Sequence, residues 1–293
     1  MATAKTVAPQ YIMAKHRFLD VSQPRLMAIL NVTPDSFADG GQFYRDSQLD
    51  RNLILTKVTQ MIDDGAEIID IGGESTRPGA QRVSVQEELE RVIPTLELIV
   101  QRFDVAVSVD TSSPAIMSAA ALAGAHLIND VRALSRPGAL EAAADSGLLV
   151  CLMHLQGEPG TMQNTPHYHN VVREVKAYLQ HRVHACLHAG IEAKNLWIDP
   201  GFGFGKTLDH NLALLRHLST MTALDYPLMV GFSRKSMIGT LLGRDLPDRL
   251  PGSLALALIA LQRGASILRV HDIGATRDII DTFMAIELYS DGK

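Results

Sequence analysis

The chain has 293 residues, of which 46% are hydrophobic, and a formal net charge of −5. This length suits two ordinary domains or a single barrel of about 250 residues, which buries a full core without disulfides or structural metals. The acidic balance gives no general attraction to nucleic acid or to anionic membranes, so we expect neither as a partner.

The sequence has no feature that indicates export or membrane insertion. No apolar run approaches the length of about 20 residues that a membrane helix requires. The first 20 residues carry several basic side chains and no apolar core of the kind found in secretion signals. Cys151 and Cys186 lie in an apolar run and a helical pattern, as buried reduced thiols do. We therefore expect a cytoplasmic protein.

Short apolar runs recur along the chain and predict strands, while the longer segments between them have helical spacing. Segment 47–63 is one such predicted helix, and segment 84–103 opens with Ser84 and Glu87 in the pattern of a capping box. Eight strands that alternate with helices are typical of a (β/α)8 TIM barrel. Periodicity cannot decide whether the sheet closes, so a doubly wound open sheet is the alternative. The predicted strands are 26–30, 67–71, 105–109, 126–128, 148–153, 196–198, 228–230 and 267–270.

The chain reads as one domain with a short extension before it. We expect residues 1–20 to form a loose extension with room for one short strand, and residues 21–293 to form the barrel. No linker rich in Pro, Gly or Ser divides the chain. Segments 33–47, 72–84 and 156–168 are longer than ordinary loops between a strand and a helix. Long loops at one end of a barrel usually close over substrate.

Polar and charged residues gather where the predicted strands end. In a barrel these carboxyl ends form the rim on which active sites are built. Any one such residue could be a turn former or a helix cap, but the repetition at six strands indicates a site. In chain order the rim residues are Asn31, Asp110, Asn129, Asp130, Asp199, the segment 231–235, Arg269 and His271.

The rim residues divide into two chemical groups. One group supplies carboxylates, an amide and an ammonium, which suit the edge of a flat heterocycle with several ring nitrogens. Its members are Asp110, Asn129, Asp199 and Lys235. The other group suits an anion, because a guanidinium offers a planar fork to phosphate oxygens. Its members are Asn31, Arg269 and His271, with backbone N–H groups expected at the helix start near Ser233.

Other patterns have ordinary explanations. The glycine run 201–205 lacks a glycine where a phosphate-binding loop requires one, because Pro200 stands there. Its glycines suit a tight turn or a close approach of the backbone to a ligand. Trp197 is expected to pack inside the barrel. For His154, which follows the fifth strand, structural hydrogen bonding and a place in the site remain equal alternatives.

Seven segments resemble, in order and spacing, the motifs of the bacterial dihydropteroate synthase family. The resemblance extends over nearly the whole chain from about residue 26. It implies a pterin-binding TIM barrel that joins a pterin diphosphate to p-aminobenzoate during folate synthesis. The segments are NVTPDSF (31–37), GGESTRPG (72–79), SVDT (108–111), IND (128–130), DPGFGFGK (199–206), GFSRKS (231–236) and RVH (269–271).

The resemblance also implies how the site residues divide the work. Pterin would be held by Asp110, Asn129, Asp199 and Lys235, in a slot shaped by Met153, Phe204 and Gly231. The diphosphate would be held by Asn31, Arg269 and His271, with Asn31 acting partly through a Mg2+ ion. The amine would be contacted by Thr76, Arg77, Pro78 and Ser233, under a first loop that carries Asp35, Phe37 and Asp39.

The implied reaction is a displacement at the methylene carbon between pterin and diphosphate. Asp35, Arg269 and His271 are the residues that the resemblance assigns to catalysis, with Arg269 and His271 opposing the charge on the leaving diphosphate. The resemblance further implies a homodimer that packs through late barrel helices. Two alternatives remain, a methyltransferase of the methyltetrahydrofolate type and a pterin-binding protein without catalytic activity.

Overall fold

The computed structural model describes residues 11–14, 17–33, 43–45, 48–74 and 83–289, and its main sheet has eight parallel strands. Their spatial order is β10-β9-β8-β7-β6-β3-β12-β11. The two ends of this series meet, because Ile198 on β10 pairs with Leu228 and donates its N–H to the Pro227 carbonyl at 3.0 Å. The strands are β3(Arg25–Asn31), β6(Ile68–Gly72), β7(Ala106–Asp110), β8(Leu127–Asp130), β9(Leu149–Met153), β10(Leu196–Asp199), β11(Met229–Val230) and β12(Ile267–Val270).

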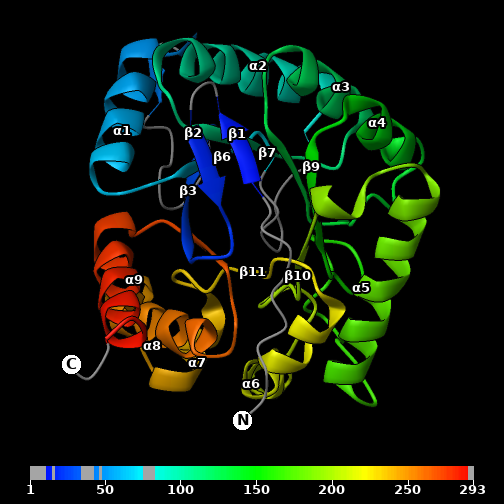
Figure 1. Ribbon diagram of the computed structural model, residues 1–293, viewed down its shortest axis with the longest axis vertical. Helices are drawn as coiled ribbons and strands as arrows, with labels where there is room; N and C mark the ends of the chain where they lie inside the picture. Colours follow the sequence, from blue (N-terminus) through cyan, green and yellow to red (C-terminus); the bar gives the residue numbers. More distant parts are fainter. Residues whose placement is uncertain (1–10, 15–16, 34–42, 46–47, 75–82, 290–293) are drawn as a thin grey trace.

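The predicted TIM barrel is therefore confirmed, and the open sheet is excluded by the pairing that closes the ring. Each predicted strand is present with its ends shifted by at most two residues. Helices surround the strands on the outside of the ring (Figure 1). They are α1(Arg51–Asp63), α2(Val85–Arg102), α3(Pro114–Leu122), α4(Ala139–Ser146), α5(Val171–His188), α6(Leu208–Arg216), α7(Ser236–Leu242), α8(Leu250–Leu261) and α9(Ile273–Glu287).

Local capping sets where the first two helices begin. The predicted capping box of α2 is present, with the Glu87 N–H donated to the Ser84 hydroxyl at 3.2 Å and the Ser84 N–H donated to the Glu87 carboxylate at 2.9 Å. Helix α1 begins at Arg51, later than predicted, because the Asp50 carboxylate accepts the Asn52 N–H at 2.9 Å. Within the described ranges, no helix combines the length and the apolarity needed to cross a membrane.

Side chains alternate along each strand between the inside of the barrel and the helices outside. In β6, Ile69 and Ile71 belong to the large cluster under the helices, whereas Ile68 belongs to the inner cluster. The inner cluster also contains the fully buried Trp197, which packs inside the barrel as expected. Further along the strands, the inward positions change from apolar to polar residues. The polar rim therefore lies directly above the inner cluster, which we call the apolar floor of the barrel.

Residues 11–20 differ from the loose extension expected there. Tyr11–Ala14 (β1) and Arg17–Asp20 (β2) pair as an antiparallel hairpin, which lies over the centre of the ring in Figure 1. Leu19 and Val21 are 2% and 3% exposed and join the inner cluster. Their burial closes the end of the barrel opposite the polar rim, and the removal of this apolar surface from water stabilises the hairpin.

Candidate active site

Strand register brings the predicted rim residues to one level of the barrel. Asp110 at the end of β7 lies beside Asn129 on β8, and Asp199 at the end of β10 lies beside Met153 on β9. On the other side, Gly72 lies between Asp110 and Asn31. Residues that are far apart in the chain thus become neighbours because parallel strands end at the same edge.

A buried network of charged and polar side chains joins four strands of the barrel, β6, β7, β8 and β12. The Arg269 guanidinium donates from Nε to the Asp70 carboxylate at 2.6 Å and from Nη2 to the Asp110 carboxylate at 2.8 Å. The Asn129 amide donates to the same Asp70 oxygen at 3.1 Å. Arg269, expected beside the diphosphate, is thus also tied to the residues expected to hold pterin. Asp70 was missed from the sequence, although a carboxylate within the apolar run 67–71 was a usable signal.

Asp110 has an unusual proton affinity at this position. Burial raises its pKa to about 7, against the opposing effect of Arg269 and with a further rise from the nearby Asp70. A carboxyl group with this pKa can either donate or accept a hydrogen bond near neutral pH. That property suits the edge of a heterocycle that carries both N–H groups and bare ring nitrogens.

The opposite wall of the site is built by Asp199 and Lys235. The Asp199 carboxylate accepts the Gly201 N–H at 2.7 Å, and burial raises its pKa, against the opposing charge of Lys235. Burial lowers the pKa of Lys235 to about 8. The Lys235 ammonium donates to the Phe202 carbonyl and lies 4.7 Å from the centre of the Phe204 ring. Phe204 and Lys235 thus lie in contact with each other.

The glycine turn after β10 is held from beneath by a buried lysine that sequence reasoning missed. Lys206 is 3% exposed, and its ammonium donates to the carbonyls of Gly201 at 2.8 Å and Phe204 at 2.9 Å. It also lies 2.9 Å from Nδ1 of His154, whose pKa burial and this ammonium lower to about 2. Neutral His154 therefore accepts this bond, which supports the structural alternative for that residue.

Gly201 serves a close approach between two segments of backbone. Its φ is +68°, and a Cβ there would lie 1.9 Å from the His154 carbonyl oxygen. The tight-turn explanation of the glycine run therefore holds, with the close approach made to the chain itself. Gly231 is less tightly placed, because its Cβ would lie 3.3 Å from the Arg269 carbonyl oxygen.

Ser233 and His271 lie together at the expected anion end. The Ser233 hydroxyl accepts the His271 N–H at 3.2 Å and lies 3.1 Å from its Nδ1. Two of the backbone N–H groups expected to face the anion here are used within the protein. Arg234 donates its N–H to the Ser253 hydroxyl at 3.0 Å, and Lys235 donates its N–H to the Phe232 carbonyl at 3.0 Å. These two N–H groups are therefore not available to an anion at this end.

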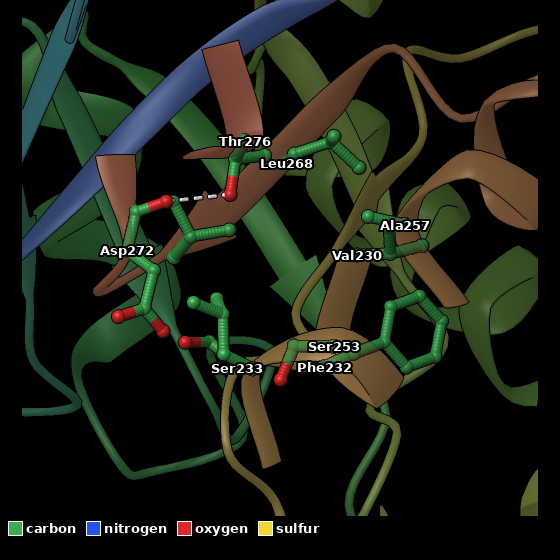
Figure 2. Close-up of a pocket in the computed structure, with 10 residues that line it drawn as sticks. Val230, Phe232, Ser233, Ser253, Ala257, Leu268, Asp272 and Thr276 are labelled. Atoms are coloured by element: carbon green, nitrogen blue, oxygen red, sulfur yellow. Dashed lines mark hydrogen bonds between the residues drawn. The ribbon is translucent and has the colours of Figure 1, made fainter. Parts of the chain in front are cut away.

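The loop that carries Ser233 is held in place by contacts of the next residue, Arg234. Arg234 has a φ of +54° and pairs with the Asp272 carboxylate, with Nε to oxygen at 3.0 Å. Figure 2 shows Ser233 and Asp272 at one end of a mostly apolar cavity. Its walls are Val230, Phe232, Leu250, Ser253, Ala257, Leu268, Val270 and Thr276.

The structure leaves some predicted residues undecided. Asn31 lies half-buried at the end of β3, and its amide oxygen lies 3.0 Å from where a Cβ on Gly72 would be. Met153 is buried at the end of β9. The other expected contacts lie outside the described residues: Asp35, Phe37, Asp39, Thr76, Arg77 and Pro78.

Comparisons with known proteins show the family of the chain. The sequence model of the family described as "Pterin binding enzyme" matches residues 27–271. The dihydropteroate synthase of Haemophilus influenzae is 52% identical over 274 residues, which cover 94% of this chain and 98% of that protein. The dihydropteroate synthase of Escherichia coli K12 is 54% identical over 265 residues, covering 90% of this chain and 92% of that protein.

Solved structures give the same result. A crystal structure of the Yersinia pestis dihydropteroate synthase with a sulfonamide drug complex superposes with a TM-score of 0.90 at 50% identity, covering 95% of this chain and all of that one. The Xanthomonas albilineans dihydropteroate synthase with 4-aminobenzoic acid superposes with a TM-score of 0.88 at 44% identity, covering 97% of this chain and all of that one. The chain therefore belongs to the pterin-binding enzyme family and, within it, to the dihydropteroate synthases, which are transferases.

Proposed function

We propose that the chain condenses (7,8-dihydropterin-6-yl)methyl diphosphate with p-aminobenzoate to give 7,8-dihydropteroate and diphosphate. The observation that carries this proposal is the ion network of Asp70, Asp110, Asn129 and Arg269, which joins a buried polar slot to a guanidinium. The ligands of the two related structures, a sulfonamide drug and 4-aminobenzoic acid, support an aromatic amine as the second substrate.

The pterin ring is bound in the slot by Asp110, Asn129, Asp199 and Lys235, which present acceptors and donors along its edge. Two buried carboxylates and one amide can take up the N–H groups of the ring, and Lys235 can donate to a ring oxygen or nitrogen. The slot walls are formed by Met153, Phe204 and Gly231. A substituent at Gly231 would press on the Arg269 backbone and narrow the slot.

The diphosphate lies at the end of the slot marked by Arg269 and His271. The chemistry of Asn31 fits a Mg2+ ion, because its amide oxygen is a hard donor and a Mg2+ ion often takes one or two protein ligands and completes its shell with substrate phosphates and water. Among the described residues no cluster of three His, Cys, Asp or Glu could hold a metal. Bound Mg2+ would supply positive charge to the phosphate oxygens.

The amine enters beside Ser233, with Thr76, Arg77, Pro78 and Phe37 as its further contacts. Its nitrogen attacks the methylene carbon, the carbon–oxygen bond to diphosphate breaks with its electron pair, and the amine releases a proton. Arg269 and His271 oppose the charge that develops on the leaving oxygens. Asp110 and Asp199 stabilise the positive charge that spreads from the methylene carbon into the ring. Asp35, on the first loop, is the third residue that the family resemblance assigns to catalysis.

An assay of diphosphate release tests this proposal. We expect release to require the pterin diphosphate and p-aminobenzoate together, with dihydropteroate formed in equal amount. Pterin binding without release would indicate a binding protein, and methyl transfer from a reduced folate would indicate the methyltransferase alternative. The cytoplasmic location and the homodimer stay predictions, which fractionation and light scattering test.

A further inference from the structure

Asp70 is a carboxylate in the middle of an otherwise apolar strand. Its neighbours Ile69 and Ile71 face the helices, so alternation turns Asp70 into the barrel beside the apolar floor. Its side chain is 0% exposed. A buried charge costs free energy unless it is paired, so its presence here requires partners that make use of it.

One oxygen of Asp70 binds two residues of the site. Oδ2 accepts from Nε of Arg269 at 2.6 Å and from Nδ2 of Asn129 at 3.1 Å. Arg269 comes from β12 and Asn129 from β8, on opposite sides of β6 in the sheet. A single atom thus connects the residue assigned to the diphosphate with a residue assigned to the pterin ring.

We propose that Asp70 is a positioning residue, which sets the plane of the Arg269 guanidinium and the rotation of the Asn129 amide for the pterin diphosphate. This inference rests on the function proposed above. The guanidinium is fixed at two points, because Asp70 holds Nε and Asp110 holds Nη2. In the described part of the chain no hydrogen bond uses Nη1, so the guanidinium keeps a donor for substrate.

The same oxygen decides which end of the Asn129 amide faces the ligand. With Nδ2 donated to Asp70, the amide oxygen Oδ1 is left as the acceptor. Oδ1 is buried and has no partner among the described residues. A buried acceptor without a partner suits a ligand that brings an N–H group, as the pterin edge does. A flipped amide would present donors there and would repel that edge.

Electrostatics support this arrangement. Burial opposes the charge on Arg269, but Asp70 and Asp110 outweigh that effect and raise the pKa of the guanidinium. Removal of the Asp70 charge would leave a buried N–H of Arg269 with a weaker acceptor and would free Asn129 to rotate. Both changes act on substrate through another residue, so Asp70 needs no contact with the substrate itself.

A double-mutant cycle tests the inference. The variants are Asp70→Asn, Arg269→Ala and the double variant, and the measured quantity is kcat/KM for diphosphate release. Misplacement of a binding group by about 1 Å can cost about 10²-fold, which is the loss expected for Asp70→Asn alone. In the Arg269→Ala background the further loss should be clearly smaller than about 10²-fold, because only the effect through Asn129 is left. Losses that multiply would overturn the inference.

Thermal unfolding of the same variants provides a readout without substrate. Asp70→Asn should lower the Tm of the wild-type protein, since it weakens a buried pair. In the Arg269→Ala background it should raise the Tm, because it removes a buried charge that has lost its cation. A fall in Tm in both backgrounds would mean that Asp70 serves folding without pairing Arg269. Should Arg269→Ala not fold, Arg269→Met, which removes the charge and keeps most of the side-chain volume, takes its place in the cycle.

Asp130→Asn is the matched control. Asp130 is also 0% exposed, but its carboxylate accepts the N–H groups of Arg132 at 2.8 Å and Leu134 at 2.7 Å. Its effect on kcat/KM should be independent of Arg269, and equal coupling for both aspartates would overturn the inference. A wild-type protein that releases no diphosphate would refute the proposed function instead, while the Tm cycle would still test the pairing.

Discussion

Replacement of Lys206 by methionine removes the ammonium beneath the glycine turn and keeps most of the side-chain volume. The ammonium donates to the Phe204 carbonyl and to Nδ1 of His154, each at 2.9 Å, and both would lose this donor. The Gly201 carbonyl would keep its bond from the Phe204 N–H at 3.1 Å. Two buried acceptors without partners cost about 1 to 3 kcal/mol each.

A gain opposes this loss, because burial holds the pKa of Lys206 well below its usual range and its removal relieves that cost. We therefore expect a net loss of about 2 to 4 kcal/mol in the free energy of unfolding, within the range for a broken buried network. Pterin affinity should fall as well, since the released turn carries Gly201, whose N–H binds Asp199 at 2.7 Å.

Urea unfolding and calorimetric titration with a pterin that lacks diphosphate measure the two effects. Lys194→Met is the matched control, because its ammonium is 68% exposed and pairs with Glu192 at the surface. This control should change stability by less than about 0.5 kcal/mol. A Lys206→Met protein as stable as the wild type would refute the reasoning. The free energy lost by burying the ammonium would then equal the free energy gained from its hydrogen bonds.

Three further predictions concern the rim and its support. His271→Ala should slow diphosphate release far more than it weakens binding of a pterin without diphosphate, and equal losses in turnover and titration would remove His271 from the anion end. His154→Gln should make stability depend less on pH in acid. Because the pKa of His154 in the folded protein is about 2, this residue stays neutral below pH 6.5, where the unfolded chain takes up a proton. The stability of the wild-type protein therefore decreases as the pH is lowered below 6.5, by about 1.4 kcal/mol per pH unit. Urea midpoints at pH 6.5 and 4.5 compare the two proteins, and equal slopes would contradict this origin. Gly201→Ala should destabilise the protein by more than about 3 kcal/mol, because a Cβ would meet the His154 carbonyl at 1.9 Å and φ is +68°; a Tm within a few degrees of the wild type would show that the turn can relax.

The barrel could be predicted because its signals are local. Each strand is a short apolar run, and the start of α2 follows from Ser84 and Glu87, which lie three positions apart. The hairpin at residues 11–20 could not be predicted in the same way. Leu19 and Val21 are ordinary apolar residues in the sequence, and their burial depends on a barrel mouth built by eight distant strands.

Site residues at strand ends were predictable for a similar reason. Asp110 and Asp199 end their strands, Asn129 lies one residue before the end of its strand, and parallel strands bring their ends together. Lys206 was hidden, because a lysine after a glycine run usually lies in solvent and here turns inward to three acceptors. Asp70 was hidden within a strand whose length and apolar character concealed one inward carboxylate.

The sequence by itself determined the order of strands and helices, the apolar floor and the types of side chain at the rim. These follow from spacing over a few residues, where the chain has little freedom. The tertiary structure decided which of these side chains meet. Arg269 reaches Asp110 across 159 positions and Asp70 across 199. Both contacts depend on the order of strands in the sheet, in which β12 lies two strands from β6 and three from β7. A local sequence pattern does not indicate such contacts, because the entropic cost of bringing distant segments together is offset by burial of the whole barrel core.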